Sequence, residues 1–208
     1  QSQMLECLPT PASFDAKSGT AITVSRLFDC LDNFLNENTA VVADPGDALF
    51  GATDLVIHAG AEFLACAYYA SLGFAVPAAI GMQLAMPDRR PIVLVGDGAF
   101  QMTGVELTTA VRYGLSPIVI VLDNAGYGTE RPMLDGPFND VHPWDVAKLP
   151  QLIGAGEGHL IETEEDFSRS MKHALNNPNS MQILHVKLEK HDISPALSRL
   201  TANLKSRV

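Results

Sequence analysis

Hydrophobic residues along the chain alternate between short, continuous apolar runs and longer stretches in which they recur at helical spacing. Runs that are apolar throughout are typical of strands covered on both faces. They occupy residues 40–43, 91–95 and 117–122, with shorter ones in 158–163 and 181–188. Helical spacing is found at residues 24–35, 101–113, 163–175 and 195–204.

The alternation of strand and helix predicts a doubly wound α/β domain, with a mainly parallel sheet and helices on both faces. The helix at 101–113 is expected to end at Gly114, and it connects two strands that should run parallel. Thr163 and Asp166 resemble a capping box, and Ser194 with Pro195 should open the last helix. Residues 1–20, rich in Pro, Ser, Thr and Gly, are predicted to be a linker or arm, and residues 21–208 to form the domain.

Residues 63–87 contain no charged side chain and are long enough to span a bilayer. The stretch includes Ser71, Gly73, Pro77 and Gln83, and it is rich in small residues. These residues favour a tightly packed buried helix over a membrane span.

The chain has 208 residues and a formal net charge of −10, which argues against a nucleic-acid surface because such a surface needs clustered Lys and Arg. Cys7, Cys30 and Cys66 are widely spaced, and they are interpreted as reduced thiols. No secretory signal peptide is recognisable among the first 20 residues, so a cytoplasmic location is expected.

The candidate chemistry begins at Gly96-Asp97-Gly98, where a buried strand meets a helix. Glycines at this position allow a sharp turn and close approach of a ligand, and the free N–H groups of a helix N-terminus favour phosphate. A bare carboxylate would repel that phosphate. A divalent cation between them removes the conflict, and Mg²⁺ is commonly shared by protein carboxylates and substrate phosphates.

A second metal ligand is expected from the next strand, which ends in the sequence LDNAGYGTE, residues 122–130. Adjacent parallel strands bring their carboxyl ends together, so Asp97 and Asn124 should face one ion. The segment between Asp123 and Trp144 has no clear periodicity and begins where α/β sheets bind ligands. Taken alone, Gly-Asp-Gly is more typical of a plain turn; the combined pattern predicts a metal–diphosphate site.

The GDG and DN pair resembles the thiamine diphosphate motif of the thiamine-dependent enzymes. Within them, DNAGYGTER is similar to the N-x-G-Y-x-x-E loop of the pyruvate and indolepyruvate decarboxylases, and AYYASLGFAVPAAIG and PFNDVHPWD also resemble that family. The similarity runs from about residue 20 to residue 208 and covers only the C-terminal, diphosphate-binding third of the family's subunit.

The resemblance implies that thiamine diphosphate and Mg²⁺ are the cofactors. The family's metal ligands fall on the side chains of Asp97 and Asn124 and the backbone carbonyl of Gly126. Gly98 and Ala99 would contact the diphosphate through backbone N–H groups. The family often has Ser or Thr where this chain has Ala99, so a hydroxyl contact is lost there.

The resemblance also implies contacts to the rest of the cofactor. Leu72 matches the apolar residue that holds the cofactor in its bent form, and the backbone of Ala70 matches the acceptor for the aminopyrimidine amino group. Asp47 matches a position near the pyrimidine, and Ser71 and Tyr127 are further expected cofactor contacts.

Glu130 is the side chain to which the resemblance assigns catalysis: it would assist loss of CO₂ and the following proton transfer, with a pKa nearer neutrality in an enclosed pocket. Without the motif, Glu130 and Arg131 would be interpreted as a plain surface ion pair. Asp123 stands where the family commonly has Asn, and little consequence is expected. His142 and Trp144 are expected to be structural.

The family's N-terminal domain supplies an activating glutamate and a neighbouring His pair, and neither is recognisable here. The chain is therefore expected to be a fragment or one subunit of a split enzyme, with little activity alone. Its expected partners are a small 2-oxo acid, a pyrimidine-binding domain from a preceding segment or a partner subunit, and further copies in a homodimer or tetramer; nucleic acid and membranes are not expected. Two alternatives remain, a carboligase of the acetolactate synthase type and a non-catalytic assembly module.

Overall fold

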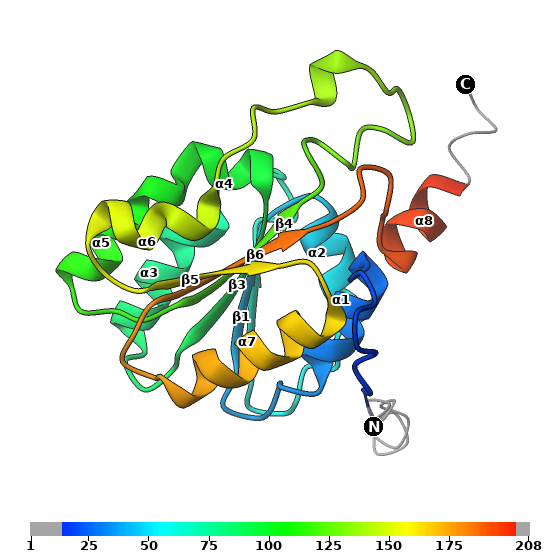
Figure 1. Cartoon of the computed structure of the whole chain (residues 1–208). Coiled ribbons are helices and arrows are strands. Elements are labelled where there is room, and N and C mark those ends of the chain that lie inside the picture. The colour runs from blue at the N-terminus through cyan, green and yellow to red at the C-terminus, as the bar shows by residue number, and fades with distance from the viewer. Residues whose placement is uncertain (1–13, 203–208) are drawn as a thin grey trace.

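The computed structural model describes residues 14–202 and contains one sheet of six parallel strands in the order β2-β1-β3-β4-β6-β5 (Figure 1). The strands are β1 (Ala40–Ala43), β2 (Glu62–Ala65), β3 (Pro91–Gly96), β4 (Ile118–Asp123), β5 (Glu157–Ile161) and β6 (Gln182–Lys187). This arrangement confirms the predicted doubly wound α/β fold.

Helices cover both faces of the sheet, as Figure 1 shows. One face carries α1 (Val24–Asp32), α2 (Asp47–Ala52) and α7 (Glu164–Asn176). The other carries α3 (Ala75–Ala85), α4 (Asp97–Thr103), α5 (Leu107–Arg112) and α6 (Leu149–Ile153). The last helix, α8 (Pro195–Ala202), lies beside α2, and three short 3₁₀ turns are η1 (Gly104–Glu106), η2 (Pro137–Asn139) and η3 (Val146–Lys148).

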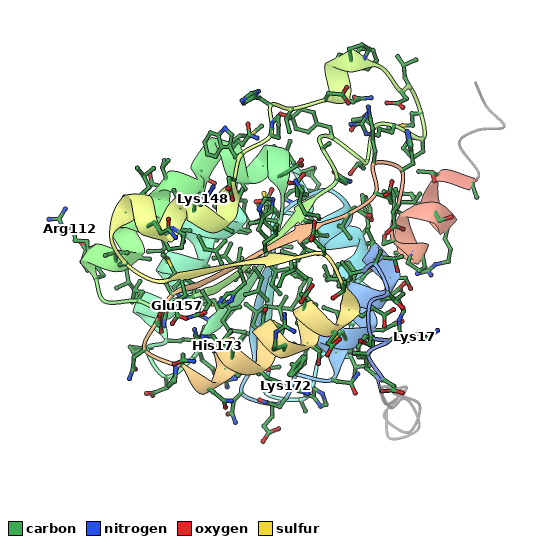
Figure 2. The ribbon with its side chains drawn as sticks, viewed as in Figure 1. Lys17, Arg112, Lys148, Glu157, Lys172 and His173 are labelled. Atoms are coloured by element: carbon green, nitrogen blue, oxygen red, sulfur yellow. The ribbon has the colours of Figure 1, made fainter. Side chains whose placement is uncertain are left out.

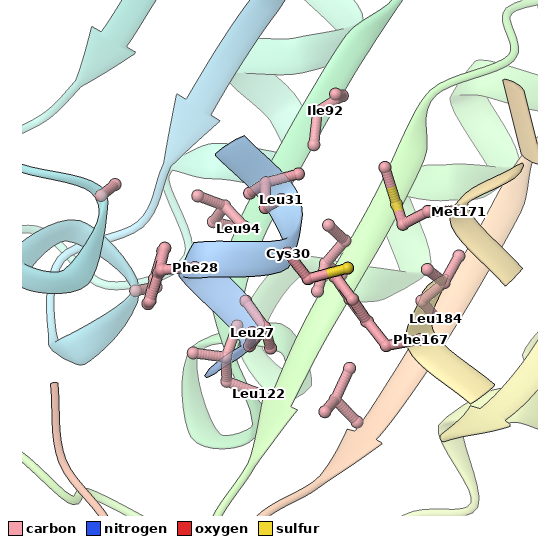
Figure 3. Packing of buried hydrophobic residues seen from close by; sticks show 14 of the residues in the cluster. Leu27, Phe28, Cys30, Leu31, Ile92, Leu94, Leu122, Phe167, Met171 and Leu184 are labelled. Atoms are coloured by element: carbon pink, nitrogen blue, oxygen red, sulfur yellow. The ribbon is translucent and has the colours of Figure 1, made fainter. Parts of the chain in front are cut away.

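The central strands are apolar throughout because each contributes side chains to two hydrophobic cores, one on each face of the sheet. Successive side chains of a strand point to opposite faces, so Ile92 and Leu94 pack with α1 and α7, whereas Val93 and Val95 pack with α3 and α4. Figure 3 shows the first core, in which Leu27 and other residues of α1 meet the strands and α7. Burial on both faces makes the central strands a rigid base for the loops that follow them.

The strand order places a switch point at β1, which pairs with β2 on one side and with β3 on the other. In open α/β sheets, ligands bind beyond the carboxyl ends of the strands at such a point. The segments after β1, β3 and β4 therefore meet at the edge of the sheet where sequence analysis expects the diphosphate.

Several local predictions are confirmed. Thr163 and Asp166 form the capping box of α7, with the Thr163 Oγ1 atom accepting the Asp166 N–H at 3.1 Å. Gly114, with a φ of 66°, ends the helical segment after α5. Ser194 precedes α8, and its Oγ accepts the N–H of Leu197 at 3.0 Å.

Two helix predictions need correction. The helix after β3 begins at Asp97 rather than residue 101, since an acidic residue in the first turn suits the helix dipole, and it breaks at Thr103 before η1 and α5. Residues 63–87 are not one buried helix: they form the end of β2, an exposed turn and α3. An uncharged composition does not distinguish burial within a chain from an apolar surface, and Gly73, with a φ of 81°, interrupts any helix.

The predicted linker lies partly outside the described residues, as do Cys7 and Leu204. Its described part lies against the domain, where the Lys17 N–H donates to Glu164 Oε2 at 3.0 Å and the Glu164 N–H donates to the Thr20 carbonyl at 3.0 Å. Cys30 and Cys66 are free thiols, as expected. Among residues 14–202, none of the helices has the length and apolar character needed to cross a bilayer.

Candidate cofactor-binding site

A cavity of about 670 Å³ opens at the carboxyl ends of β1, β3 and β4. Most of the predicted site residues share it: the lining includes Asp47, Ala70, Leu72, Asp97, Gly98, Ala99, Asn124, Gly126, Tyr127 and Glu130. Ser71, His142 and Trp144 are not among the lining residues. Segments that are far apart in the sequence therefore meet where the motif predicts a single site.

Asp97 is the first residue of α4, and its carboxylate is buried beside the loop that follows β4. Its Oδ1 atom accepts the Gly98 N–H at 2.8 Å. Burial and the nearby charge of Asp123 raise the pKa of Asp97. A carboxylate in this position is a favourable ligand for a small divalent cation, which would offset its buried negative charge.

Asp123 is part of a buried polar cluster that sequence analysis did not anticipate. Its Oδ2 atom lies 2.6 Å from His185 Nε2 and 2.5 Å from Lys187 Nζ. Burial opposes ionisation, but the hydrogen bonds from His185 and Lys187 outweigh it and lower the pKa of Asp123. The expectation that Asp123 has little consequence is therefore wrong: it places a compensated negative charge beside Asp97.

Asn124 and the glycines around it form a tight turn. A Cβ atom on Gly128 would lie 2.3 Å from Asn124 Nδ2, and one on Gly126 would lie 1.9 Å from the Asn139 carbonyl oxygen. Ala125, between Asn124 and Gly126, has a φ of 61°, a sparsely populated value for a non-glycine residue. Within residues 14–202, the buried Asn124 side chain has no hydrogen-bond partner, so its amide is left for a ligand.

Gly98 is required by the close approach of Tyr127, because a Cβ atom there would lie 2.8 Å from Tyr127 Cε1. Ala99 follows in the first turn of α4, where a backbone N–H has no partner within the helix. The turn of α4 and the ring of Tyr127 thus form one wall of the cavity.

Arg131 holds the long loop after β4 in place. The guanidinium group is buried and donates to Asp135 Oδ1 at 2.7 Å, Asp140 Oδ1 at 2.8 Å and the Ala125 carbonyl at 3.1 Å. A surface ion pair between Arg131 and Glu130, the plain alternative, is contradicted because Arg131 pairs with these aspartates. Glu130 is left exposed at the rim of the cavity.

Asp44, at the end of β1, was missed by sequence analysis. Its buried carboxylate accepts the N–H of Gly73 at 3.0 Å and that of Ala75 at 2.7 Å. These bonds fix the turn that presents Leu72 and leads into α3. Ala70, in the same turn, has a φ of 51°, so a second strained residue lies at the cavity.

Asp47 joins the cavity to α8. Its Oδ2 and Oδ1 atoms accept the backbone N–H and the hydroxyl of Ser194 at 2.8 Å and 2.5 Å. Burial raises the pKa of Asp47. Its carboxylate is thus committed to the start of α8 while the residue lines the cavity.

The donor atoms around Asp97 fit Mg²⁺ with a diphosphate. The set comprises the Asp97 carboxylate, the Asn124 side-chain amide and the Gly126 backbone carbonyl, whose oxygens are ligands that Mg²⁺ prefers. Three protein ligands leave room for phosphate oxygens and water. The residues at this site therefore fit the Mg²⁺ ion and the diphosphate that the motif implies.

Comparisons with known proteins agree with this geometry. Residues 44–186 match the family described as "Thiamine pyrophosphate enzyme, C-terminal TPP binding domain". The chain is 32% identical over 171 residues to a probable pyruvate decarboxylase, Pdc101, of Schizosaccharomyces pombe, which covers 80% of this chain and 30% of the relative. It is 33% identical over 184 residues to an alpha-keto-acid decarboxylase of Mycolicibacterium paratuberculosis, covering 86% of this chain and 32% of the relative.

An alpha-keto-acid decarboxylase of Mycobacterium tuberculosis is 32% identical over 188 residues, with 88% of this chain and 33% of the relative covered. The chain thus spans about a third of the length of the curated relatives that it matches. The family match covers more than half of the chain; it begins directly after β1 and includes β3 and β4 with the loops that follow them. The chain belongs to the thiamine pyrophosphate enzymes and contains their C-terminal cofactor-binding domain.

Proposed function

We propose that the chain is the diphosphate-binding part of a non-oxidative 2-oxo acid decarboxylase, of the pyruvate, indolepyruvate or phenylpyruvate type, which gives an aldehyde and CO₂. The observation that supports this most directly is that Asp97, Asn124, Gly126 and Glu130 line one cavity at the switch point of the sheet. The decarboxylase names of the relatives agree with it.

We assign the metal to three groups: the side chains of Asp97 and Asn124 and the backbone carbonyl of Gly126 would hold Mg²⁺. Gly98 and Ala99 would bind the diphosphate that shares the ion. Mg²⁺ offsets the negative charge of Asp97 and Asp123, so a diphosphate is accepted at an otherwise acidic site.

The rest of the cavity would bind the organic part of the cofactor. Leu72 would support its bent form, and Ala70, Asp47 and Tyr127 would contact it. Ser71 was also expected to contact it but does not line the cavity. When bound, thiamine diphosphate supplies a thiazolium ring that adds to the keto carbon of a 2-oxo acid and accepts the electrons released as CO₂ leaves.

Glu130 would then act as the general acid. Its carboxyl group lies at the rim of the cavity, on the loop after β4, and would deliver the hydrogen that replaces CO₂ in the aldehyde. In this chain Glu130 is exposed, and a partner domain that excludes water would complete the enclosed pocket that the role requires.

The apolar surface beside the cavity supports such a partner. Tyr68 and Tyr69 are 91% and 81% exposed, and Phe63, Leu64 and Leu72 are also exposed, on β2 and the turn that follows it. Contiguous exposed apolar side chains mark interaction sites. We assign this surface to a pyrimidine-binding domain, from a preceding segment or a partner subunit, in a homodimer or tetramer; the cytoplasmic location stays a prediction.

The substitution Glu130→Gln in the complete decarboxylase tests the proposal. We expect aldehyde formation to fall by about 100-fold or more, because general acid–base catalysis contributes on that order. Assembly and cofactor content should be unchanged, and Glu37→Gln, an exposed carboxylate on another loop, should retain activity. Full activity in the Glu130→Gln variant would exclude the assigned role.

Product analysis separates the alternatives. With pyruvate, the decarboxylase yields acetaldehyde and a carboligase yields acetolactate. A complete protein that assembles and binds the cofactor but yields neither product would be the assembly module instead.

A further inference from the structure

Three potential metal ligands meet at the opposite end of the sheet from the cofactor cavity. Glu157 is the first residue of β5, and the strands are parallel, so it lies at the amino end of the sheet while the cavity lies at the carboxyl end. Figure 2 labels Glu157 on β5 and His173 on α7 at this end. His159 follows on β5.

Strand and helix geometry explain why these side chains converge. Glu157 and His159 are two positions apart on β5, so they point to the same face of the strand. His173 belongs to the last turn of α7, which covers that face. The rings of His159 and His173 have centroids 5.2 Å apart.

Buried Gln182 prepares His159 as a ligand. The Gln182 Nε2 atom donates to Glu157 Oε1 at 3.2 Å and to Ser180 Oγ at 3.1 Å, which directs its Oε1 atom to His159 Nε2 at 2.8 Å. Because an amide oxygen only accepts, His159 Nε2 carries the proton and Nδ1 keeps its lone pair. Metal-bound histidines commonly have one ring N–H held by a carbonyl in this way.

Glu157 and His173 supply the other two donors. Glu157 Oε2 lies 2.8 Å from His173 Nε2, so a proton is shared at the point where an ion would sit. Both side chains are 43% exposed, which lets them adjust and leaves a position for water.

We propose that Glu157, His159 and His173 bind Zn²⁺, with water as the fourth ligand. One ligand atom from each residue lies within 4.8 Å of the others, so movement of the side chains can place all three at about 2.0–2.2 Å from one ion. Two imidazoles and one carboxylate favour Zn²⁺ over Mg²⁺, which prefers oxygen ligands. The ion would replace the proton between His173 and Glu157 and fasten edge strand β5 to α7.

The site is distinct from the proposed Mg²⁺ site, and the experiment separates them. The 208-residue chain, without a histidine tag, is titrated with Co²⁺ in excess Mg²⁺ and without thiamine diphosphate. Under the proposed function, Mg²⁺ would occupy the oxygen ligands around Asp97, and Co²⁺ with two imidazoles in four-coordinate geometry gives strong visible absorption. We expect one equivalent of Co²⁺ to bind and Zn²⁺ to displace it.

Three variants assign the ligands. His173→Ala, His159→Ala and Glu157→Gln should each weaken Co²⁺ binding by at least about tenfold, since even residues that only support a ligand cost that much. His191→Ala removes an exposed histidine elsewhere and should leave binding unchanged. Zn²⁺ should also raise the thermal unfolding midpoint of the native chain but not that of His173→Ala, because binding to the folded state stabilises it.

Two results would overturn the site. One is the lack of any Co²⁺ spectrum or Zn²⁺ effect on unfolding at millimolar metal. The other is binding that the three substitutions leave unchanged. His173 is exposed, so its replacement by Ala should fold even if His159→Ala does not.

Discussion

Asp97 shows how a single residue combines function with a stability cost. Its carboxylate is buried near that of Asp123, and both burial and that charge raise the pKa of Asp97. The metal-free folded chain therefore holds a proton at Asp97 more tightly than the unfolded chain does. The free energy of unfolding then falls as pH rises from the usual pKa of an aspartate, about 3.9, toward the raised value.

Asp97→Asn should therefore raise the free energy of unfolding of the metal-free chain at neutral pH, because it removes the repulsion. Asp123→Asn should lower it, by about 1 kcal/mol or more, because His185 and Lys187 lose a charged acceptor. Urea unfolding of both variants in the presence of a chelator measures these opposite signs. Destabilisation by Asp97→Asn would contradict the assigned conflict of charges.

The residues of this site differ in how far sequence reveals them. Asp97 and Asn124 were predictable because each directly follows an apolar run, and parallel strands bring those ends together. The partners of Asp123 were not, because His185 and Lys187 reach it only through the register of β4 with β6, where Asp123 lies opposite Lys187. Contacts between distant segments depend on strand order, which the apolar pattern leaves open.

At the scale of elements, two turns shape the cavity, and each is fixed by a buried charged side chain. Asp44 fixes the turn before α3 through two backbone N–H groups, and Arg131 fixes the loop after β4 through carbonyls and aspartates. Arg131 ends the quoted sequence DNAGYGTER, but that motif did not indicate its partners, and Asp44 belongs to none of the quoted motifs. The hydrophobic pattern predicted most helices and strands, but it missed α2, α6, the start of α4 and the segment at residues 63–74. It gave no indication of what fixes these two turns.

Asp44→Asn should destabilise the chain by about 1–3 kcal/mol, because the amide NH₂ group would face a backbone N–H donor. Cofactor binding should weaken as well, since the same turn presents Leu72 and Ala70. The urea unfolding midpoint measures the first effect. Asp88→Asn, at an exposed position, is the control and should stay within about 0.5 kcal/mol of the native chain. An unfolding free energy equal to that of the control would show that Asp44 does not hold the turn.

Gly126→Ala tests the loop after β4. The new Cβ atom would lie 1.9 Å from the Asn139 carbonyl, so the turn carrying Asn124 must move. Gly114→Ala is a matched control, since Gly114 also has positive φ but has nothing within 4 Å of the added atom. Gly114→Ala should cost about 1–2 kcal/mol from backbone strain alone. Gly126→Ala should lower the free energy of unfolding, measured with urea, by more than Gly114→Ala does. Equal losses for the two variants would mean that the loop accommodates the added Cβ atom without an energetic penalty.

At the scale of the whole molecule, the two-sided sheet creates a rigid edge on which the cavity is built. The cavity opens beside an exposed apolar surface formed by β2 and the following turn. The composition of residues 63–87 indicated burial, and the structure exposes the first half of that segment instead. An apolar segment that is buried against a partner domain has the same composition as one that is buried in the core of its own chain. The sequence pattern alone therefore does not distinguish the two.

The exposed cavity determines how the isolated chain should behave. The diphosphate and its metal would meet their full set of ligands, whereas the pyrimidine would lie open to water. We therefore expect weak binding of thiamine diphosphate and negligible turnover of 2-oxo acids by the 208 residues alone. Robust decarboxylation of pyruvate or phenylpyruvate by the pure chain would contradict this division of the site.

The central claim is that Asp97 and Asn124 hold a Mg²⁺ ion that binds the diphosphate, and ³¹P NMR of thiamine diphosphate tests it at the atoms concerned. Addition of the chain with Mg²⁺ should shift and broaden the diphosphate resonances. A chelator, or the double substitution of Asp97 and Asn124 by Ala, should abolish this change while circular dichroism shows a folded chain. Resonances that respond equally without Mg²⁺ or with the double variant, or that do not respond to the native chain at millimolar concentration, would contradict the account.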